Sequence, residues 1–255
     1  WFVDKQGRER PRVQRKKIGL LVAYGVDPAT GEWWVLDWER AEQEDQDSWE
    51  RLLERLRQRG LRAEKGLRLI VSDGSDGLAA ALGMVNLGSG VGHQRCIFHK
   101  LRNVAKAVKA ALAESKEEKR QQRREVLREA AAIYEGEDRA EIVRRRDEFV
   151  AKWQETEPEA VATLLRDFEQ TIVYLEELAA ASARGEPWEV RYLRTTSALE
   201  RLNRTLRRMV RQVVLFHSDA GLEVRVYLIL MQAGEMLITQ GEDWLEVLEK
   251  ELAAA

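Results

Sequence analysis

The apolar run from Gly66 to Ser72 constrains the fold more than any other feature of the chain. Its hydrophobic residues are nearly continuous instead of alternating with polar ones. Strands of this kind are covered on both faces, as in layered α/β proteins. Asp73 follows directly, at the carboxyl end of the predicted strand, where open α/β sheets present functional groups. Asp73 is therefore a candidate site residue in an α/β fold.

A structural role for Asp73 is the alternative, because an aspartate that precedes a helix often caps it. Such a helix is predicted at Gly77–Met84. Ser72, Ser75 and Asp76 could cap that helix equally well. Since capping does not require Asp73, we favour a functional role for this residue over one for Asp76.

Strands and helices are both predicted in about the first hundred residues, beginning with three strands in succession. Strands are predicted at Trp1–Asp4, Lys16–Val26, Glu32–Trp38 and His93–Phe98, in addition to the central one. The second and third of these flank turn residues and predict a β-hairpin. Apolar residues at helical spacing predict an amphipathic helix at Ser48–Arg59.

The rest of the chain is helical in pattern. Helices are predicted at Lys100–Leu112, Lys116–Tyr134, Arg139–Thr156, Pro158–Ala181, Thr195–Val213 and Ala220–Ile238, with an amphipathic tail at Trp244–Leu252. A mixed sheet interrupted by a helical insertion is the most economical architecture. We therefore predict a core in two parts, residues 1–104 and 191–255, separated by a helical insertion at 105–190.

One cysteine in 255 residues excludes an internal disulfide framework and fits a reducing compartment. No apolar run approaches the roughly 18 residues that span a bilayer. The excess of arginine over lysine hints at a GC-rich bacterial genome. We expect a cytoplasmic, nucleoid-associated protein. The chain lacks an initiator Met and begins almost at Asp4, so we also expect residues upstream to be missing.

Positive charge is concentrated in two segments, although the net charge is only −2. Residues 94–128 contain eleven lysines and arginines against four glutamates, and residues 191–211 contain seven arginines against one acid, Glu200. Basic faces on a nearly neutral protein indicate a polyanionic partner. Solvated helix faces are the alternative.

Glu200 belongs to an arginine-rich helix face. At 100° per residue, Arg204, Arg207 and Arg211 fall within about 40° of Glu200, and Asn203 lies about 60° away. A Glu–Arg pair at i,i+4 explains Arg204 as ordinary surface chemistry. It does not explain the two further arginines, whereas a phosphate backbone running past a metal-bound carboxylate would, because guanidinium groups bind phosphate bidentately.

Three carboxylates on separate elements, Asp4, Asp73 and Glu200, suit a site for divalent metal ions. Two such ions can activate the attacking oxygen and stabilise the leaving oxygen of a phosphodiester. Magnesium prefers hard oxygen ligands. These acids therefore predict two Mg²⁺ or Mn²⁺ ions and a reaction that cuts or joins nucleic acid.

Three segments carry a resemblance to a known family. Val71-Ser72-Asp73-Gly74, the stretch from His93 to Val104 and the stretch from Thr195 to Arg207 resemble the Mutator-like (MULE) transposases and their bacterial insertion-sequence relatives. The likeness runs from end to end of the chain, with Trp1-Phe2-Val3-Asp4 fitting the first catalytic strand.

The resemblance implies an RNase H-like core of the Asp-Asp-Glu type, in which the helical insertion lies between the second Asp and the Glu. By position, Asp4, Asp73 and Glu200 correspond to the catalytic, metal-binding triad. Cleavage at transposon ends and strand transfer into target DNA are the implied activities. Double-stranded DNA is the expected partner, and the protein is expected to bind it as at least a homodimer. The candidate DNA contacts are Arg102, Asn203, Arg204, Arg207 and Arg211.

Cys96 and His99 coincide with the Cys-x-x-His signature of that family, which implies a role in supporting the active site. The same spacing is half of a zinc site. With no second cysteine, His93 and His217 are the only histidines left to complete it. A buried structural pair is the third interpretation.

Other functions remain open. Another RNase H-like nuclease, such as a junction resolvase, would cut DNA without joining it. A domesticated relative would bind DNA without catalysis. A helical scaffold would use the charged faces to oligomerise. Asp27 and Asp37 are alternatives to Asp4 as the first acid.

Overall fold

The computed structural model describes residues 2–3, 5–10, 19–111, 114–211 and 218–236. The strands are β1 Phe2–Val3, β2 Glu9–Arg10, β3 Gly19–Val26, β4 Trp33–Ala41, β5 Leu69–Ser72 and β6 Gly92–Arg95. The helices are α1 Gln46–Gln58, α2 Asp76–Met84, α3 Ile97–Ala107, α4 Lys116–Ile133, α5 Arg139–Trp153, α6 Pro158–Leu165, α7 Tyr174–Ala183, α8 Val190–Arg194, α9 Ser197–Arg211 and α10 Asp219–Met236. Two short 3₁₀ turns are η1 Ala63–Lys65 and η2 Phe168–Thr171.

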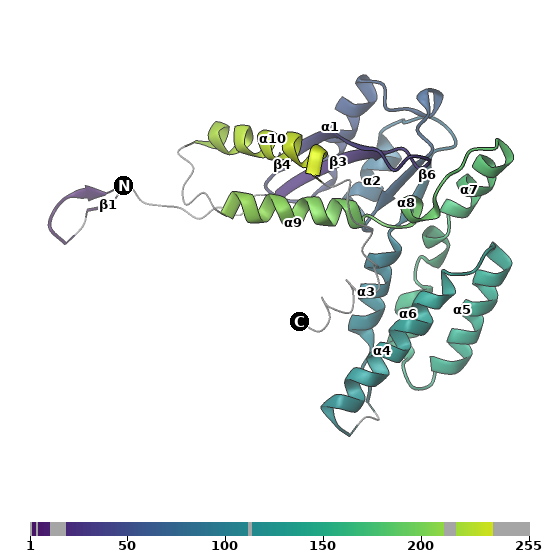
Figure 1. The fold of residues 1–255 in the computed structure, drawn as a ribbon. Helices are drawn as coiled ribbons and strands as arrows, with labels where there is room; N and C mark the ends of the chain where they lie inside the picture. The colour runs from purple at the N-terminus through teal and green to yellow at the C-terminus, as the bar shows by residue number, and fades with distance from the viewer. Residues whose placement is uncertain (1, 4, 11–18, 112–113, 212–217, 237–255) are drawn as a thin grey trace.

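The described strands pair two by two. β1 pairs with β2 and β3 with β4, both antiparallel, whereas β5 and β6 are parallel. The predicted hairpin, the strand ending at Ser72 and the mixed α/β class are confirmed. The predicted single sheet is not seen among these residues, in which three two-stranded sheets form, and the β1–β2 hairpin stands apart from the other strands in Figure 1.

The β3–β4 hairpin lies between two helical layers (Figure 1). Val22 packs with Leu202 and Leu206 of α9 and with residues of α10. Leu21, its neighbour, packs with Leu52 and Leu56 of α1 on the opposite face. Successive side chains of a strand point to opposite faces. The hairpin therefore lies between α9 and α1, with one helix packed on each face.

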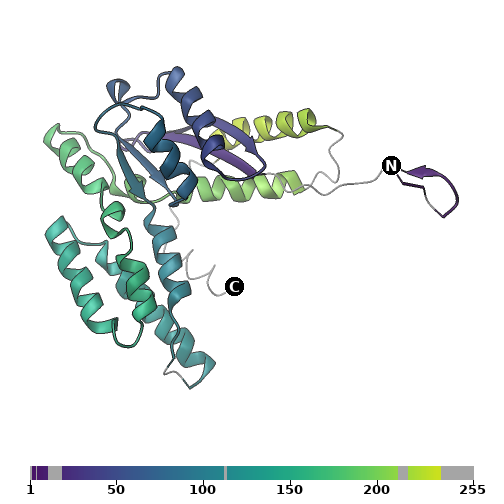
Figure 2. The same ribbon diagram turned by 180° about the vertical axis from the view of Figure 1, so that it is seen from behind.

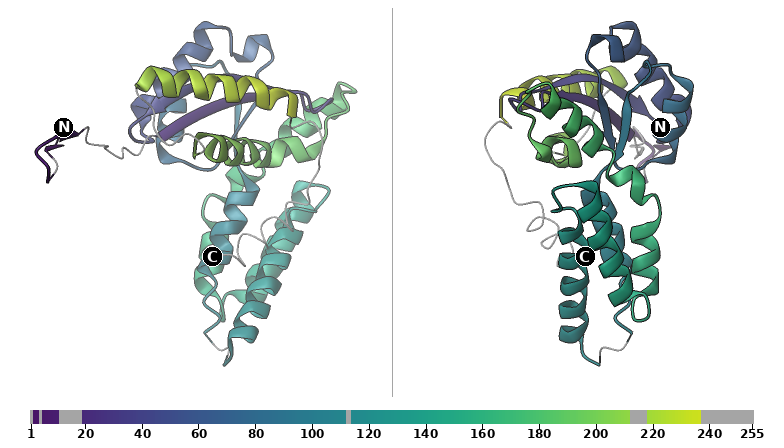
Figure 3. Two further views of the ribbon diagram at one scale, coloured as in Figure 1. Left: turned by 60° about the vertical axis from the view of Figure 1, so that its left-hand side comes forward. Right: turned by 90° about the vertical axis from the view of Figure 1, so that its right-hand side faces the viewer.

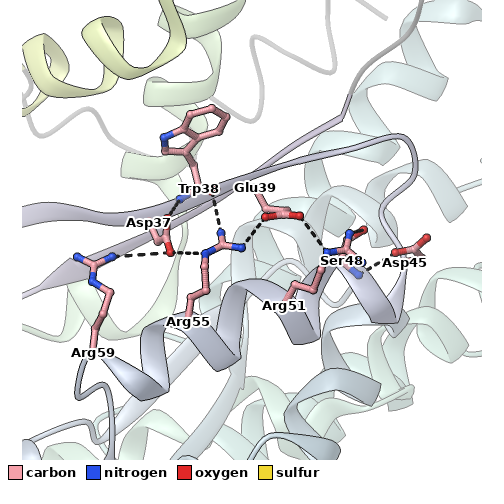
Figure 4. A network of polar contacts seen from close by, with 8 residues as sticks. All are labelled: Asp37, Trp38, Glu39, Asp45, Ser48, Arg51, Arg55 and Arg59. Atoms are coloured by element: carbon pink, nitrogen blue, oxygen red, sulfur yellow. Dashed lines mark hydrogen bonds and ion pairs between the residues drawn. The ribbon is translucent and has the colours of Figure 1, made fainter. Parts of the chain in front are cut away.

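An ion network fixes α1 on the hairpin (Figure 4). The Arg55 guanidinium of α1 lies 3.1 Å from Asp37 and 2.7 Å from Glu39 of β4, and it also donates to the carbonyl oxygen of Trp38. Arg51 adds a second contact to Glu39 at 3.1 Å. Both acids are largely buried, at 18% and 17% side-chain exposure, so each depends on these arginines for its neutralisation.

β5 is covered on both faces, as its sequence predicts. Ile70 packs with α1 and α2 through Leu53 and Leu78. Leu69 and Val71 pack on the other face with the largest hydrophobic cluster, which extends from Cys96 through the helices α4–α7 to Leu193. Asp73 thus follows a strand that has a hydrophobic cluster packed on each face, with its three apolar side chains partly buried.

The helices α3–α6 form a block that projects away from the β3–β4 layer, and η2 and α7 lead from it back to β6 (Figures 2 and 3). Buried polar side chains attach it to the strands. Gln94 of β6, fully buried, donates to the carbonyl oxygen of Thr171 at 2.7 Å and accepts from the amide of Tyr174 at 3.0 Å. The predicted limits of the insertion, 105–190, stay a prediction. None of the helices in the described part of the chain combines the length and the hydrophobicity of a membrane-spanning segment.

Candidate active site

Asp73 lies on an exposed turn between β5 and α2. Its Oδ1 accepts a hydrogen bond from the amide of Ser75 at 3.2 Å. Ser75, not Asp73, is the N-cap residue of α2. The aspartate therefore shapes its own turn, and its exposed carboxylate is left accessible at the carboxyl end of β5.

Gly74 allows this turn to form. Its φ is +90°, in the region that L side chains avoid, and a Cβ built on it would lie 2.6 Å from Cζ of Arg95. The Arg95 guanidinium is itself held by Asp167, 3.2 Å away, in the segment before η2. The turn after Asp73 is thus closed by an arginine that also contacts the helical block.

Gly74→Ala is expected to lower the free energy of unfolding by about 2–3 kcal/mol. The alanine backbone would be strained in the left-handed conformation, and its Cβ would lie too close to Arg95. Gly90→Ala is the matched control, since Gly90 has a similar φ of +82° but no heavy atom within 4 Å of the added Cβ. That change should cost only the strain, about 1–2 kcal/mol. Urea denaturation of both variants measures the difference, and equal losses would show that Arg95 yields freely.

Glu200 lies in the first turn of α9, and His99 lies in the first turn of α3. The ring Nε2 of His99 is 3.0 Å from Oε1 of Glu200. His99 is 6% exposed in this pair and Glu200 is 35% exposed. The ordinary i,i+4 pair of Glu200 with Arg204 does not form among the described residues; a histidine from a distant helix takes that place.

Cys96 joins the two acid-bearing segments. Its amide donates to the carbonyl oxygen of Ser72 at 2.7 Å, one residue before Asp73. Its sulfur accepts from both the amide and the hydroxyl of Thr196, each at 3.3 Å. Thr196 in turn accepts from the amide of Glu200 at 3.0 Å. The segments that carry Asp73 and Glu200 therefore meet at one buried cysteine.

The ionisation of this cluster is strongly perturbed. Burial lowers the pKa of His99, but the nearby Cys96 sulfur and the Glu200 carboxylate outweigh it and raise the pKa to about 9. The hydrogen bond from His99 holds the pKa of Glu200 below its usual range against partial burial, and the charges of Arg102 and Arg207 act in the same direction. Glu200 is thus an anion paired with a cationic imidazole near neutral pH. Nδ1 of His99 is buried without a well-formed hydrogen bond in the described part of the chain.

The predicted arginine face is present on α9. Leu202 and Leu206 are buried against the hairpin, and Arg204 and Arg207 are exposed on the other side. Neither arginine forms an ion pair within the described residues. Asn203 of α9 and Arg102 of α3 are both half-buried. Arg204 and Arg207 thus form a positive surface next to Glu200.

Several predicted residues cannot be placed. Asp4 and His217 lie outside the described residues, as does the side chain of Arg211. The two alternatives to Asp4 have structural partners: Oδ1 of Asp27 accepts from the amide of Ala29 at 2.8 Å in the β3–β4 turn, and Asp37 binds Arg55. The place of Asp4 in the triad stays a prediction.

No group of three His, Cys, Asp or Glu side chains in the described segments is arranged to hold a metal ion. His93, a candidate for a zinc site, binds the Ser72 hydroxyl instead, with Nε2 2.8 Å from Oγ. Asp73 and Glu200 are nevertheless carboxylates with exposed oxygen, which is the donor type that Mg²⁺ and Mn²⁺ prefer.

Sequence reasoning missed Ser72, Thr196 and Arg95. Ser72 and Thr196 each form a hydrogen bond with Cys96, and Arg95 closes the turn after Asp73. The contact between Thr196 and Cys96 spans 100 positions, so no local pattern could have revealed it.

Comparison with known proteins identifies the family. The family model for the Mutator family of transposases matches residues 6–239. The chain belongs to the Mutator family of transposases. The family membership expected from the sequence is confirmed.

Individual insertion-sequence transposases show the same relationship. The transposase of IS406 from Burkholderia multivorans is 32% identical over 217 residues, covering 84% of this chain and 50% of the relative. That of ISRM5 from Rhizobium meliloti is 29% identical over 89% of the chain and 49% of the relative. The transposase of IS905 from Lactococcus lactis is 26% identical over 80% and 46%. The chain thus spans about half the length of these relatives.

Proposed function

We propose that the chain is the catalytic part of an Asp-Asp-Glu transposase that cleaves DNA at transposon ends and transfers the strand into target DNA. The observation that carries this proposal is the meeting of the Asp73 turn and the first turn of α9 at Cys96. Membership of a transposase family supports it. An RNase H-like core completed by Asp4 is part of the proposal.

Asp73 and Glu200 are the described residues that would hold the metal ions, with Asp4 as the third ligand. Two divalent ions bound there would supply activation of the attacking oxygen and stabilisation of the leaving oxygen. The chain itself supplies orientation: the Ser75 amide holds one oxygen of Asp73, and His99 holds one oxygen of Glu200. Each carboxylate keeps a second oxygen for a metal ion.

We assign the exposed arginines of α9 to the DNA backbone. Arg204 and Arg207 lie on the face that also carries Glu200, and Arg102 brings a further charge to the same carboxylate. Phosphate contacts of this kind position a duplex without reading its sequence. DNA would then pass along α9 with a phosphodiester beside the carboxylates, bound by at least two copies of the protein.

Arg207→Gln is expected to weaken DNA binding and to reduce the slope of log K against log salt concentration by about one, because one phosphate contact and its released counterion are lost. Lys65→Gln is the matched control, since Lys65 is also exposed but belongs to η1 and not to α9. Fluorescence anisotropy at several salt concentrations gives both slopes. An unchanged slope for Arg207→Gln would exclude the α9 face from the DNA contact.

A combined cleavage and strand-transfer assay tests the proposal. The substrate is a plasmid that carries the chain's own coding sequence with its flanks, incubated with the full-length protein and Mg²⁺ or Mn²⁺. Cut ends joined to a target plasmid are expected. Cutting without joining would indicate a nuclease of the resolvase type, and binding without cutting would indicate a catalytically silent relative.

A further inference from the structure

Thr196 stands immediately before α9 and is buried, with 4% of its surface exposed. A threonine in this place commonly caps its own helix by accepting from an amide of the first turn. Here the hydroxyl instead donates to the sulfur of Cys96, and the Thr196 amide donates to the same sulfur. The residue therefore contacts a different part of the chain through two of its own donors.

Cys96 occupies the equivalent place before α3. Its carbonyl oxygen accepts from the amide of Lys100 at 3.1 Å, and its amide binds the strand end at Ser72. The first turns of α3 and α9 thus lie side by side, with one contact at their starts, Cys96 to Thr196, and a second contact one turn later, His99 to Glu200.

We infer that Thr196 is a positioning residue for Glu200, fixing the start of α9 on Cys96 and thereby on the strand end that carries Asp73. One contact between two helices leaves rotation about that contact free. A second contact about 6 Å further along α9, four residues at 1.5 Å each, restricts that rotation. Leu202 and Leu206 hold α9 on the hairpin, but without the Thr196 contact the pair of Glu200 with His99 would be the remaining polar contact described here between the first turns of α9 and α3.

The consequence concerns the reaction and rests on the proposed function. Metal-assisted chemistry depends on where the carboxylates stand relative to one another, and a displacement of about 1 Å at a reacting centre can cost about a hundredfold in rate. A threonine that only stabilised the fold would change melting temperature and activity together. A positioning residue lowers the rate of cleavage while the affinity for DNA and the stability stay close to those of the parent protein.

Thr196→Val tests the inference, because valine keeps the shape but removes the hydroxyl, which leaves the amide as the only donor from this residue to the Cys96 sulfur. The rate constant for cleavage at saturating DNA and Mn²⁺ is expected to fall about 10- to 100-fold, with the Kd for DNA within about twofold. Thr196→Ser keeps the hydroxyl and should restore most of the rate. Thr205→Val, the same change at a half-buried position further along α9, is the matched control and should leave the rate unchanged.

Hydrogen exchange of the first turn of α9 provides a readout that needs no catalysis. Thr196→Val should speed exchange of the peptide that contains Glu200, and Thr196→Ser and Thr205→Val should not. A parental rate and parental exchange in Thr196→Val would overturn the inference, as would a serine variant as slow as the valine variant. Failure of the parent protein to cut DNA would instead overturn the proposed function, and the exchange result would still decide the role of Thr196.

Discussion

Asp73→Asn is expected to abolish DNA cleavage and strand transfer, with a loss of about a thousandfold or more, while the protein stays folded and binds DNA as tightly as before or more tightly. A divalent ion contributes several kcal/mol to a phosphoryl-transfer transition state, and about 4 kcal/mol corresponds to a thousandfold in rate. The amide of asparagine keeps the acceptor for the Ser75 amide, so the turn persists. Asparagine would lack the negative charge that, under the proposed function, holds a metal ion and repels phosphate.

Asp76→Asn is the matched control for this experiment. Asp76 is also an exposed carboxylate, three positions further along, but it lies in the first turn of α2. Its loss should cost only the favourable interaction with the helix dipole, about 0.3–1 kcal/mol, with cleavage preserved. Cleavage by Asp73→Asn, or its loss in Asp76→Asn alone, would refute the assignment of Asp73.

Glu157→Ala is expected to lower the free energy of unfolding by about 3–5 kcal/mol. Glu157 is 1% exposed, and its two carboxylate oxygens accept from the amides of Lys109 and Ala110 and from the side chain of Gln122, each at 2.8 Å. Removing the carboxylate leaves three buried or half-buried donors without their acceptor. Each lost hydrogen bond costs about 1–3 kcal/mol of stability before the structure relaxes. The α3–α4 connection would lose its attachment to α6.

Glu159→Ala provides the comparison at the same end of α6. Glu159 is 64% exposed and pairs with Lys109 Nζ at 3.2 Å. Surface pairs contribute about 0–1 kcal/mol, so this variant should unfold almost as the parent does. Denaturant titration monitored by circular dichroism measures both variants. Similar losses for the two would mean that Glu157 is hydrated in solution and does not anchor the block.

Local patterns allowed much of the fold to be predicted. The apolar side chains between Leu67 and Val71 favour removal from water, and Ile70 and Val71 do pack in different clusters. The apolar stripe of α9 fixed which side of the helix meets the hairpin, and so placed Glu200 and Arg207 on the other side. Periodicity carries this information within a few residues of each position.

The partners of the site could not be predicted in this way. Glu200 was expected among arginines, but its nearest partner is His99, and the alternative acid Asp37 is engaged by Arg55 on the opposite face of the hairpin. Both outcomes depend on how elements distant in the sequence pack, which no local pattern encodes.

The sequence by itself determined the family, the candidate acids and the faces of the helices that carry them, because those properties follow from residue identity and spacing. Only the tertiary structure decided that Cys96 lies between the Ser72 carbonyl and Thr196. The end of β5 and the start of α9, which is 100 positions beyond the cysteine, therefore bind the same buried residue. The physical reason is that a buried donor must find an acceptor, and which acceptor it finds is settled by the packing of the whole chain.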